Sequence, residues 1–176
     1  MKVNIEIFSI SVATMLLAVL TIMIAINGLS DLVFAQGGSK FTINLTGSEE
    51  VPPVQTNATG TAEISAFDIS SDSISYGINA TNISGPTAAH THLGKPGENG
   101  PIVVTFFNYT GPRPINEVME GGTITAADLE GPLKGKPLSE LAVAGANGSL
   151  YINIHTEQYP NGEIRGQIVN PAGQRQ

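Results

Sequence analysis

The sequence predicts an all-β domain, an antiparallel β-sandwich of seven to eight short strands with one short helix. Three observations support this fold class. Apolar and polar residues alternate with a period of two in several segments from residue 40 onward. Turn-forming clusters rich in Gly, Pro, Asn and Asp separate these segments at short intervals. The 176-residue chain has 20 glycines, 11 prolines and only 13% charged residues, which favours a turn-rich β protein.

The first 35 residues are expected to lie outside the folded domain. The chain is uncharged from Ile7 to Ser30, and small and apolar residues precede Gln36. These are features of a secretory signal peptide. The run from Ile7 to Ile26 is also long enough for an uncleaved membrane anchor. Either way, the domain is expected outside the cytoplasm, secreted or at the cell surface, with membrane contact only through residues 1–35 if they are retained.

The first strands are expected to have one apolar and one polar face. Phe41, Ile43 and Leu45 alternate with polar residues, and residues 73–80 alternate in the same way. Successive side chains of a strand face opposite sides, so one side of each strand is expected to enter the core. Residues 101–107 form a more continuous apolar run, which predicts a strand buried on both faces.

The single helix is expected late in the chain, before a final hairpin. A Thr-capped turn is predicted from Thr125 to Asp128, and the helix from about Pro137 to near Gly145. Alternation then resumes in the two strands of the hairpin, residues 149–156 and 162–168. The expected organisation is a leader, a linker, one domain and a disordered tail, at residues 1–35, 36–39, 40–169 and 170–176.

Composition excludes several classes of function. A net charge of −7 with only 8 Lys and Arg residues argues against a nucleic-acid partner. The absence of cysteine excludes disulfides, thiolate nucleophiles and Cys-ligated metals. The chain has no G-x-S-x-G motif, and GKPGENG does not have the spacing of a phosphate loop. The sequence therefore identifies no catalytic residues and does not favour an enzyme.

Six Asn-x-Ser/Thr sequons occur, more than chance placement of these residues gives. They are candidates for glycosylation if the host has the machinery, and a Ser-, Thr- and Asn-rich β surface is the alternative explanation. Their excess favours an exported surface protein. The asparagines are Asn44, Asn57, Asn79, Asn82, Asn108 and Asn147.

Four segments occur in a fixed order between about Phe41 and Ile168: LTGSEEVPPVQTNATGTA, AAHTHLGKPGENGPIVV, GSLYINIHT and GEIRGQI. Together they resemble the CHRD (chordin) domain family, in its microbial single-domain type. The resemblance implies an immunoglobulin-like β fold and an extracellular setting. In animal chordin such domains belong to a growth-factor antagonist. The resemblance therefore favours a binding or interaction module, and fold alone does not assign an activity.

The final hairpin is expected to carry a polar face. Ile152 and Ile154 are predicted to face the core, so the residues between and beside them face away. If residues 156–162 form the loop, polar residues of the two strands stand opposite one another. The expected pairs are Tyr151 with Gln167, Asn153 with Arg165, and His155 with Glu163.

The three histidines of the chain are candidate metal ligands. His90 and His92 are two residues apart on a predicted strand and therefore face the same side. If that strand lies near the polar face of the hairpin, His90, His92, His155 and Glu163 can bind one copper or zinc ion. Three histidines without a disulfide are too few for a copper–zinc superoxide dismutase site. Two alternatives stay open: hydrogen bonds among these residues and the turn backbone, or contact with another ligand or partner.

Three functions follow from these observations. The first is an extracytoplasmic binding or interaction module whose partner is an extracellular protein or a cell-envelope component. The second is a small metalloprotein that binds copper or zinc through the three histidines. The third is a structural component of the cell envelope, assembled through exposed strand edges.

Overall fold

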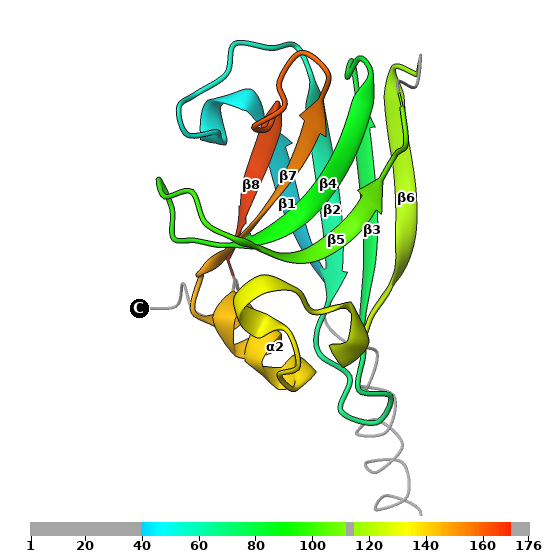
Figure 1. Cartoon of the computed structure of the whole chain (residues 1–176), viewed down its shortest axis with the longest axis vertical. Coiled ribbons are helices and arrows are strands. Elements are labelled where there is room, and N and C mark those ends of the chain that lie inside the picture. Colours follow the sequence, from blue (N-terminus) through cyan, green and yellow to red (C-terminus); the bar gives the residue numbers. More distant parts are fainter. Residues whose placement is uncertain (1–39, 112–114, 170–176) are drawn as a thin grey trace, which may run out of the picture. The chain divides into compact units, whose positions relative to one another are not determined.

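The computed structural model describes residues 40–111 and 115–169, drawn in colour in Figure 1. The predicted leader, linker and C-terminal tail lie outside the described residues. Eight strands are present: β1 (Lys40–Thr46), β2 (Thr59–Ser65), β3 (Ile74–Thr81), β4 (Pro86–Leu93), β5 (Ile102–Asn108), β6 (Glu117–Ile124), β7 (Leu150–Thr156) and β8 (Ile164–Ile168). All the pairings between them are antiparallel, which confirms the predicted all-β class and strand number for the described residues.

The helical segments agree with the prediction. The α-helix α2 (Leu138–Ala146) begins after Pro137 and ends one residue beyond the expected Gly145. A 3₁₀ helix at Ala126–Asp128 forms the predicted Thr-capped turn, in which the Thr125 hydroxyl donates to the Asp128 carboxylate. Two further 3₁₀ helices lie at Gly47–Glu49 and Gly131–Leu133. No helix in the described ranges is both long enough and apolar enough to cross a lipid bilayer.

The structure corrects the predicted division into two sheets. All eight strands form one sheet in the order β5-β4-β7-β8-β1-β2-β3-β6. The β1–β8 junction at its centre consists of a single residue pair, Thr46 with Arg165. Tyr109, just after β5, donates its hydroxyl to Glu120 of β6, so the two end strands are also linked. The sheet is therefore strongly curled, and alternation alone did not show that β1 and β8 would join its two halves.

One hydrophobic core fills the inside of this curled sheet. Its buried members come from all eight strands, which requires the two halves of the sheet to share the same interior. Ile78, Ile152 and Ile154 are fully buried there, as predicted. Tyr76 and Phe106, also predicted as core, are half-buried and pack against it with ring centroids 4.6 Å apart. A second apolar cluster includes Leu residues of α2 and closes one end of the domain (Figure 1).

The outer face of β4, β7 and β8 is also buried, although its side chains are polar. Tyr151 and Asn153 are each 2% exposed and Arg165 is 1% exposed. Two loops, residues 47–58 and 94–100, lie beside these strands in Figure 1. The Thr56 hydroxyl donates to Glu163 at 2.6 Å, and Arg165 bonds to the second loop. The domain therefore has a buried polar layer outside its apolar core, and the candidate site lies in this layer.

Candidate metal centre

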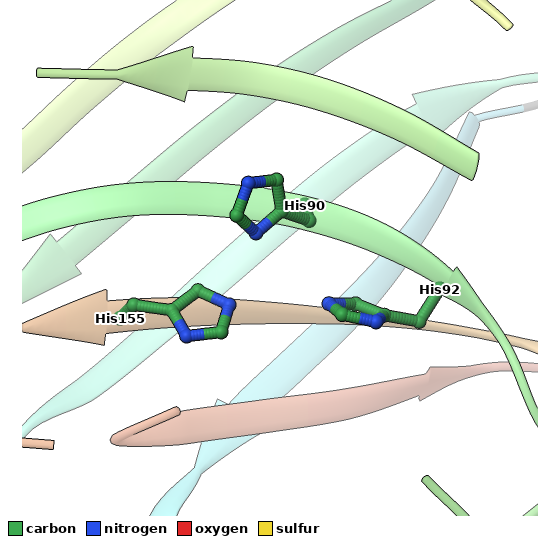
Figure 2. A group of neighbouring side chains, drawn as sticks. All are labelled: His90, His92 and His155. Atoms are coloured by element: carbon green, nitrogen blue, oxygen red, sulfur yellow. The ribbon is translucent and has the colours of Figure 1, made fainter. Parts of the chain in front are cut away.

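The curled sheet brings the three histidines together. His90 and His92 lie on β4, which pairs with β7, the strand that carries His155. The ring centroids are 4.9 Å apart for His90 and His155, 5.7 Å for His90 and His92, and 6.1 Å for His92 and His155. One candidate ligand nitrogen from each residue lies within 4.8 Å of the other two. Figure 2 shows a nitrogen of each ring turned toward a common point.

Two of the histidines use their other nitrogen to contact turn backbone. The Nδ1 of His92 donates to the Gly100 carbonyl at 2.8 Å, and the Nδ1 of His155 donates to the Pro160 carbonyl at 2.9 Å. A proton on Nδ1 leaves Nε2 as an unprotonated acceptor in the neutral ring. Both Nε2 atoms, and the Nδ1 of His90, are buried and have no hydrogen-bond partner. No hydrogen bond joins one of these described imidazoles to another. Hydrogen bonds to turn backbone therefore account for one nitrogen of His92 and one of His155, and leave the three converging nitrogens unexplained.

The surroundings keep these imidazoles neutral. Burial lowers the pKa of all three histidines. The pKa of His90 falls to about 4, because the neighbouring His155 and His92 add to the effect of burial. For His92, the Gly100 carbonyl and the Asn153 side chain oppose this lowering of the pKa. At neutral pH the cluster therefore presents neutral rings, the form of histidine that binds a metal.

The dimensions of the cluster fit a single ion. At zinc–nitrogen distances of ~2.0–2.1 Å, two nitrogen ligands of a tetrahedral ion lie about 3.4 Å apart. The candidate nitrogens lie within 4.8 Å of one another, so binding requires each pair to approach by at most about 1.4 Å, which side-chain rotation can supply. Three histidine ligands leave a fourth, open position on a tetrahedral ion.

Glu163, the fourth candidate ligand of the sequence prediction, is not part of the group that His90, His92 and His155 form. Its buried carboxylate accepts a hydrogen bond from the Thr56 hydroxyl. The β7–β8 register confirms the expected pairs of Tyr151 with Gln167 and Asn153 with Arg165, but the ladder ends at Ile154 with Ile164. The ladder does not extend to the expected pair of His155 with Glu163, because β8 begins at Ile164 and not at Glu163.

The remaining predicted polar residues support the cluster from β7 and β8. Tyr151 stacks on the ring of His92, with centroids 4.8 Å apart and 5° between the planes. The amide of Gln167 donates to the Gly94 carbonyl at 2.9 Å and so holds the start of the 94–100 loop. Tyr151 therefore contacts one histidine of the cluster, and Gln167 contacts the loop.

Glu50 is a buried residue of this layer that the sequence analysis does not identify. It is 5% exposed and follows the 3₁₀ helix at Gly47–Glu49. Burial raises the pKa of its carboxyl to about 7, although the Arg165 charge, the Asn153 side chain and the Val51 backbone act in the opposite direction. In the sequence it is marked only by its place in the EVPP segment, where the two prolines predict a turn at a strand edge.

Glu50→Gln is expected to stabilise the domain at pH 8 and to have little effect at pH 4. The pKa of about 7 in the folded protein exceeds the ordinary glutamate value of 4.5, so folding favours the protonated carboxyl. The contribution of the Glu50 carboxyl to the free energy of unfolding is fully present below pH 4.5 and is lost as the pH rises through 7. The free energy of unfolding of wild type is therefore expected to be about 3 kcal/mol lower at pH 8 than at pH 4 on account of this carboxyl. Urea unfolding of the metal-free protein at both pH values measures it.

Glu49→Gln is the control, because Glu49 is an exposed neighbour of Glu50. It should leave the pH dependence of unfolding as in wild type. A Glu50→Gln protein that is less stable than wild type at pH 8 would show instead that the ionised carboxylate forms a favourable pair with Arg165.

Comparison with known proteins identifies the domain. A family model of the CHRD domain matches residues 41–168, which is almost the whole described part of the chain. No curated protein and no solved structure matches the sequence. The buried polar layer contains residues from all four segments of the sequence resemblance. In chain order these are Glu50 and Thr56; His90, His92 and the 94–100 loop; Tyr151, Asn153 and His155; and Arg165. The chain belongs to the CHRD domain family.

Proposed function

We propose that this protein is an extracytoplasmic binding module whose ligand is one transition-metal ion, held by His90, His92 and His155. The observation that carries the proposal is the convergence of three buried imidazole nitrogens without hydrogen-bond partners. Each buried polar atom left unpaired costs ~1–3 kcal/mol. An ion at the common point would satisfy all three nitrogens at once, and the lowered pKa values keep their lone pairs available.

Copper(II) and zinc are the metals that this donor set favours. Imidazole nitrogens suit both ions, and copper(II) binds nitrogen ligands more tightly than zinc does. With three neutral ligands the bound ion keeps its full charge and one open position. A water molecule or a donor group of a partner protein fits that position, which agrees with a role of the domain in interactions.

Elemental analysis of the mature protein isolated from its own host tests the proposal. One copper or zinc ion per chain is the expected result, together with tight rebinding after removal by a chelator. Protein that contains neither metal and binds neither copper(II) nor zinc in calorimetric titrations would refute it, and the histidines would then serve only to hold the turns at Gly100 and Pro160.

Export is the second part of the proposal. CHRD domains are typically extracellular, and the uncharged run before Gln36 has the features of a signal peptide. The side chains of all six sequon asparagines are exposed in the structure, as glycosylation requires. These residues are Asn44, Asn57, Asn79, Asn82, Asn108 and Asn147.

The mature chain is expected to begin at Gln36. Intact-mass measurement of the protein from the extracellular fraction should give the mass of residues 36–176, with the loss of ammonia if Gln36 has cyclised to pyroglutamate. Additional hexose-containing mass that disappears on Asn→Gln substitution would identify the glycosylated sequons. Full-length protein confined to the membrane fraction would show that residues 1–35 are a retained anchor.

A further inference from the structure

Arg165 on β8 is a fully buried cation whose hydrogen bonds go to one loop. It is 1% exposed, and a charged side chain is rarely buried to this extent unless it is well paired. Its Nη1 donates to Oδ1 of Asn99 at 3.1 Å. Its Nη2 donates to the backbone carbonyls of Lys95 at 3.3 Å and Glu98 at 2.9 Å. The guanidinium therefore fixes the 94–100 loop over the outer face of the sheet.

Arg165 also contacts the ring on which His92 stacks. Its Cζ lies 3.4 Å from the centroid of the Tyr151 ring. The strand order β4-β7-β8 places Tyr151 between His92 and Arg165. The planes of His92 and Tyr151 are 5° from parallel, so the position of the tyrosine ring limits the rotation of the imidazole.

Gly100, at the end of the same loop, completes the connection to His92. Its backbone N–H donates to the Tyr151 hydroxyl at 3.2 Å, and its carbonyl accepts the Nδ1 proton of His92 at 2.8 Å. A Cβ at this position would lie 1.8 Å from the Leu93 carbonyl oxygen, so only glycine allows this close approach. The loop that Arg165 holds therefore supplies the carbonyl that selects the His92 tautomer.

We infer that Arg165 is a positioning residue for His92, acting through the 94–100 loop and the Tyr151 ring. It fixes the imidazole with Nδ1 protonated and Nε2 directed at His90 and His155. His155 takes its own orientation from Pro160 and is independent of this loop. The inference rests on the proposed function for its effect on metal affinity, whereas the effect on the His92 ring exists in metal-free protein as well.

The first measurement uses the metal-free protein. Nitrogen-15 NMR of the imidazoles should show His92 and His155 as Nδ1–H tautomers with slowly exchanging protons. In Arg165→Lys, which keeps the charge and loses the planar fork, His92 is expected to lose this protection while His155 keeps it. Asn99→Ala, at an exposed loop position, should give a smaller change of the same kind at His92. Lys95→Ala leaves the carbonyl of Lys95 in place and serves as the unaffected control.

The second measurement is copper(II) affinity and the electron paramagnetic resonance spectrum. Loss of a group that orients a metal ligand typically weakens affinity by ~10–100-fold, and Arg165→Lys should fall in this range with an altered spectrum. Unchanged His92 signals in Arg165→Lys would overturn the inference. If Arg165→Lys does not fold, the same measurement is made on Asn99→Ala, and unchanged His92 signals in that variant would overturn the inference.

The two proposals fail in different ways. Wild-type protein that binds no metal but shows the His92 change in the variants would refute the proposed function and support the positioning role. Wild-type protein that binds copper(II), with variants of equal affinity and unchanged His92 signals, would support the proposed function and refute the positioning role.

Discussion

His155→Ala is expected to weaken copper(II) or zinc binding by more than ~100-fold, since even the loss of a supporting residue costs ~10–100-fold. The variant leaves His90 and His92 on one strand, and two imidazoles cannot hold an ion as three do. His90→Ala and His92→Ala should lower the affinity to a similar extent, because each supplies one of the three unpaired nitrogens. Calorimetric titration at pH 7 measures the three affinities.

Glu163→Gln is the matched control for these substitutions. Glu163 is buried in the same polar layer, but its carboxylate bonds to Thr56 and lies outside the histidine cluster. Its replacement should leave the metal affinity close to that of wild type. An affinity that falls as far in Glu163→Gln as in His155→Ala would mean that the carboxylate is a ligand and that the proposed three-histidine set is incomplete.

The pH dependence of binding gives a second check on the same site. Protons compete with the metal for the imidazole nitrogens, so affinity falls as pH drops through the histidine pKa values. Burial lowers these values, with that of His90 reduced to about 4. Binding should therefore persist below the usual histidine range near pH 6.5. Loss of binding already at pH 7 would show that the rings are protonated in the folded protein.

Apolar alternation was sufficient to predict the faces of the last hairpin and the convergence of its polar residues. The period of two separates Ile152 and Ile154 from Tyr151 and Asn153, and the short loop restricts the register. The structure has these pairs as expected. The ladder ends before the expected pair of His155 with Glu163, and the Glu163 carboxylate accepts a hydrogen bond from the Thr56 hydroxyl.

The strands β2 and β6 were harder to recognise from the sequence. TGTAEIS in β2 and EVMEGGTI in β6 contain few bulky apolar residues, since small residues such as Gly60 and Ala62 pack closely against neighbouring strands. Their places in the sheet depend on pairing with β3, which is a tertiary contact. The two-residue alternation of apolar and polar side chains does not show which strands are neighbours in the sheet.

The burial of the polar face was also beyond sequence reasoning. Polar residues at alternate positions of a strand normally predict a face exposed to solvent, yet Asn153 and Arg165 are almost fully buried. Arg165 is covered because the 94–100 loop folds back and its backbone carbonyls accept hydrogen bonds from the guanidinium. Loop conformation of this kind is set by hydrogen bonds between distant segments, which no local pattern of residues reveals.

Ile152→Ala is expected to lower the free energy of unfolding by ~2–5 kcal/mol, because deletion of buried methyl groups leaves a cavity. Ile152 is fully buried in the main core at the centre of β7. Val143→Ala, on a residue of α2 that is 57% exposed, is the matched control and should change stability little. Chemical denaturation of the metal-free proteins measures both, and an Ile152→Ala protein as stable as the control would mean that the assigned face of β7 is wrong.

The same variant separates the fold from the site, because the two lie on opposite faces of one strand. Ile152 faces the core, whereas its neighbours Tyr151 and Asn153 face the histidine cluster. Ile152→Val should cost less, ~0.5–1.5 kcal/mol, and retain the backbone position of β7. Under conditions in which both variants are folded, their copper(II) affinities should therefore equal that of wild type. A graded loss of affinity in step with stability would show that core packing, and not the polar layer, holds His155 in place.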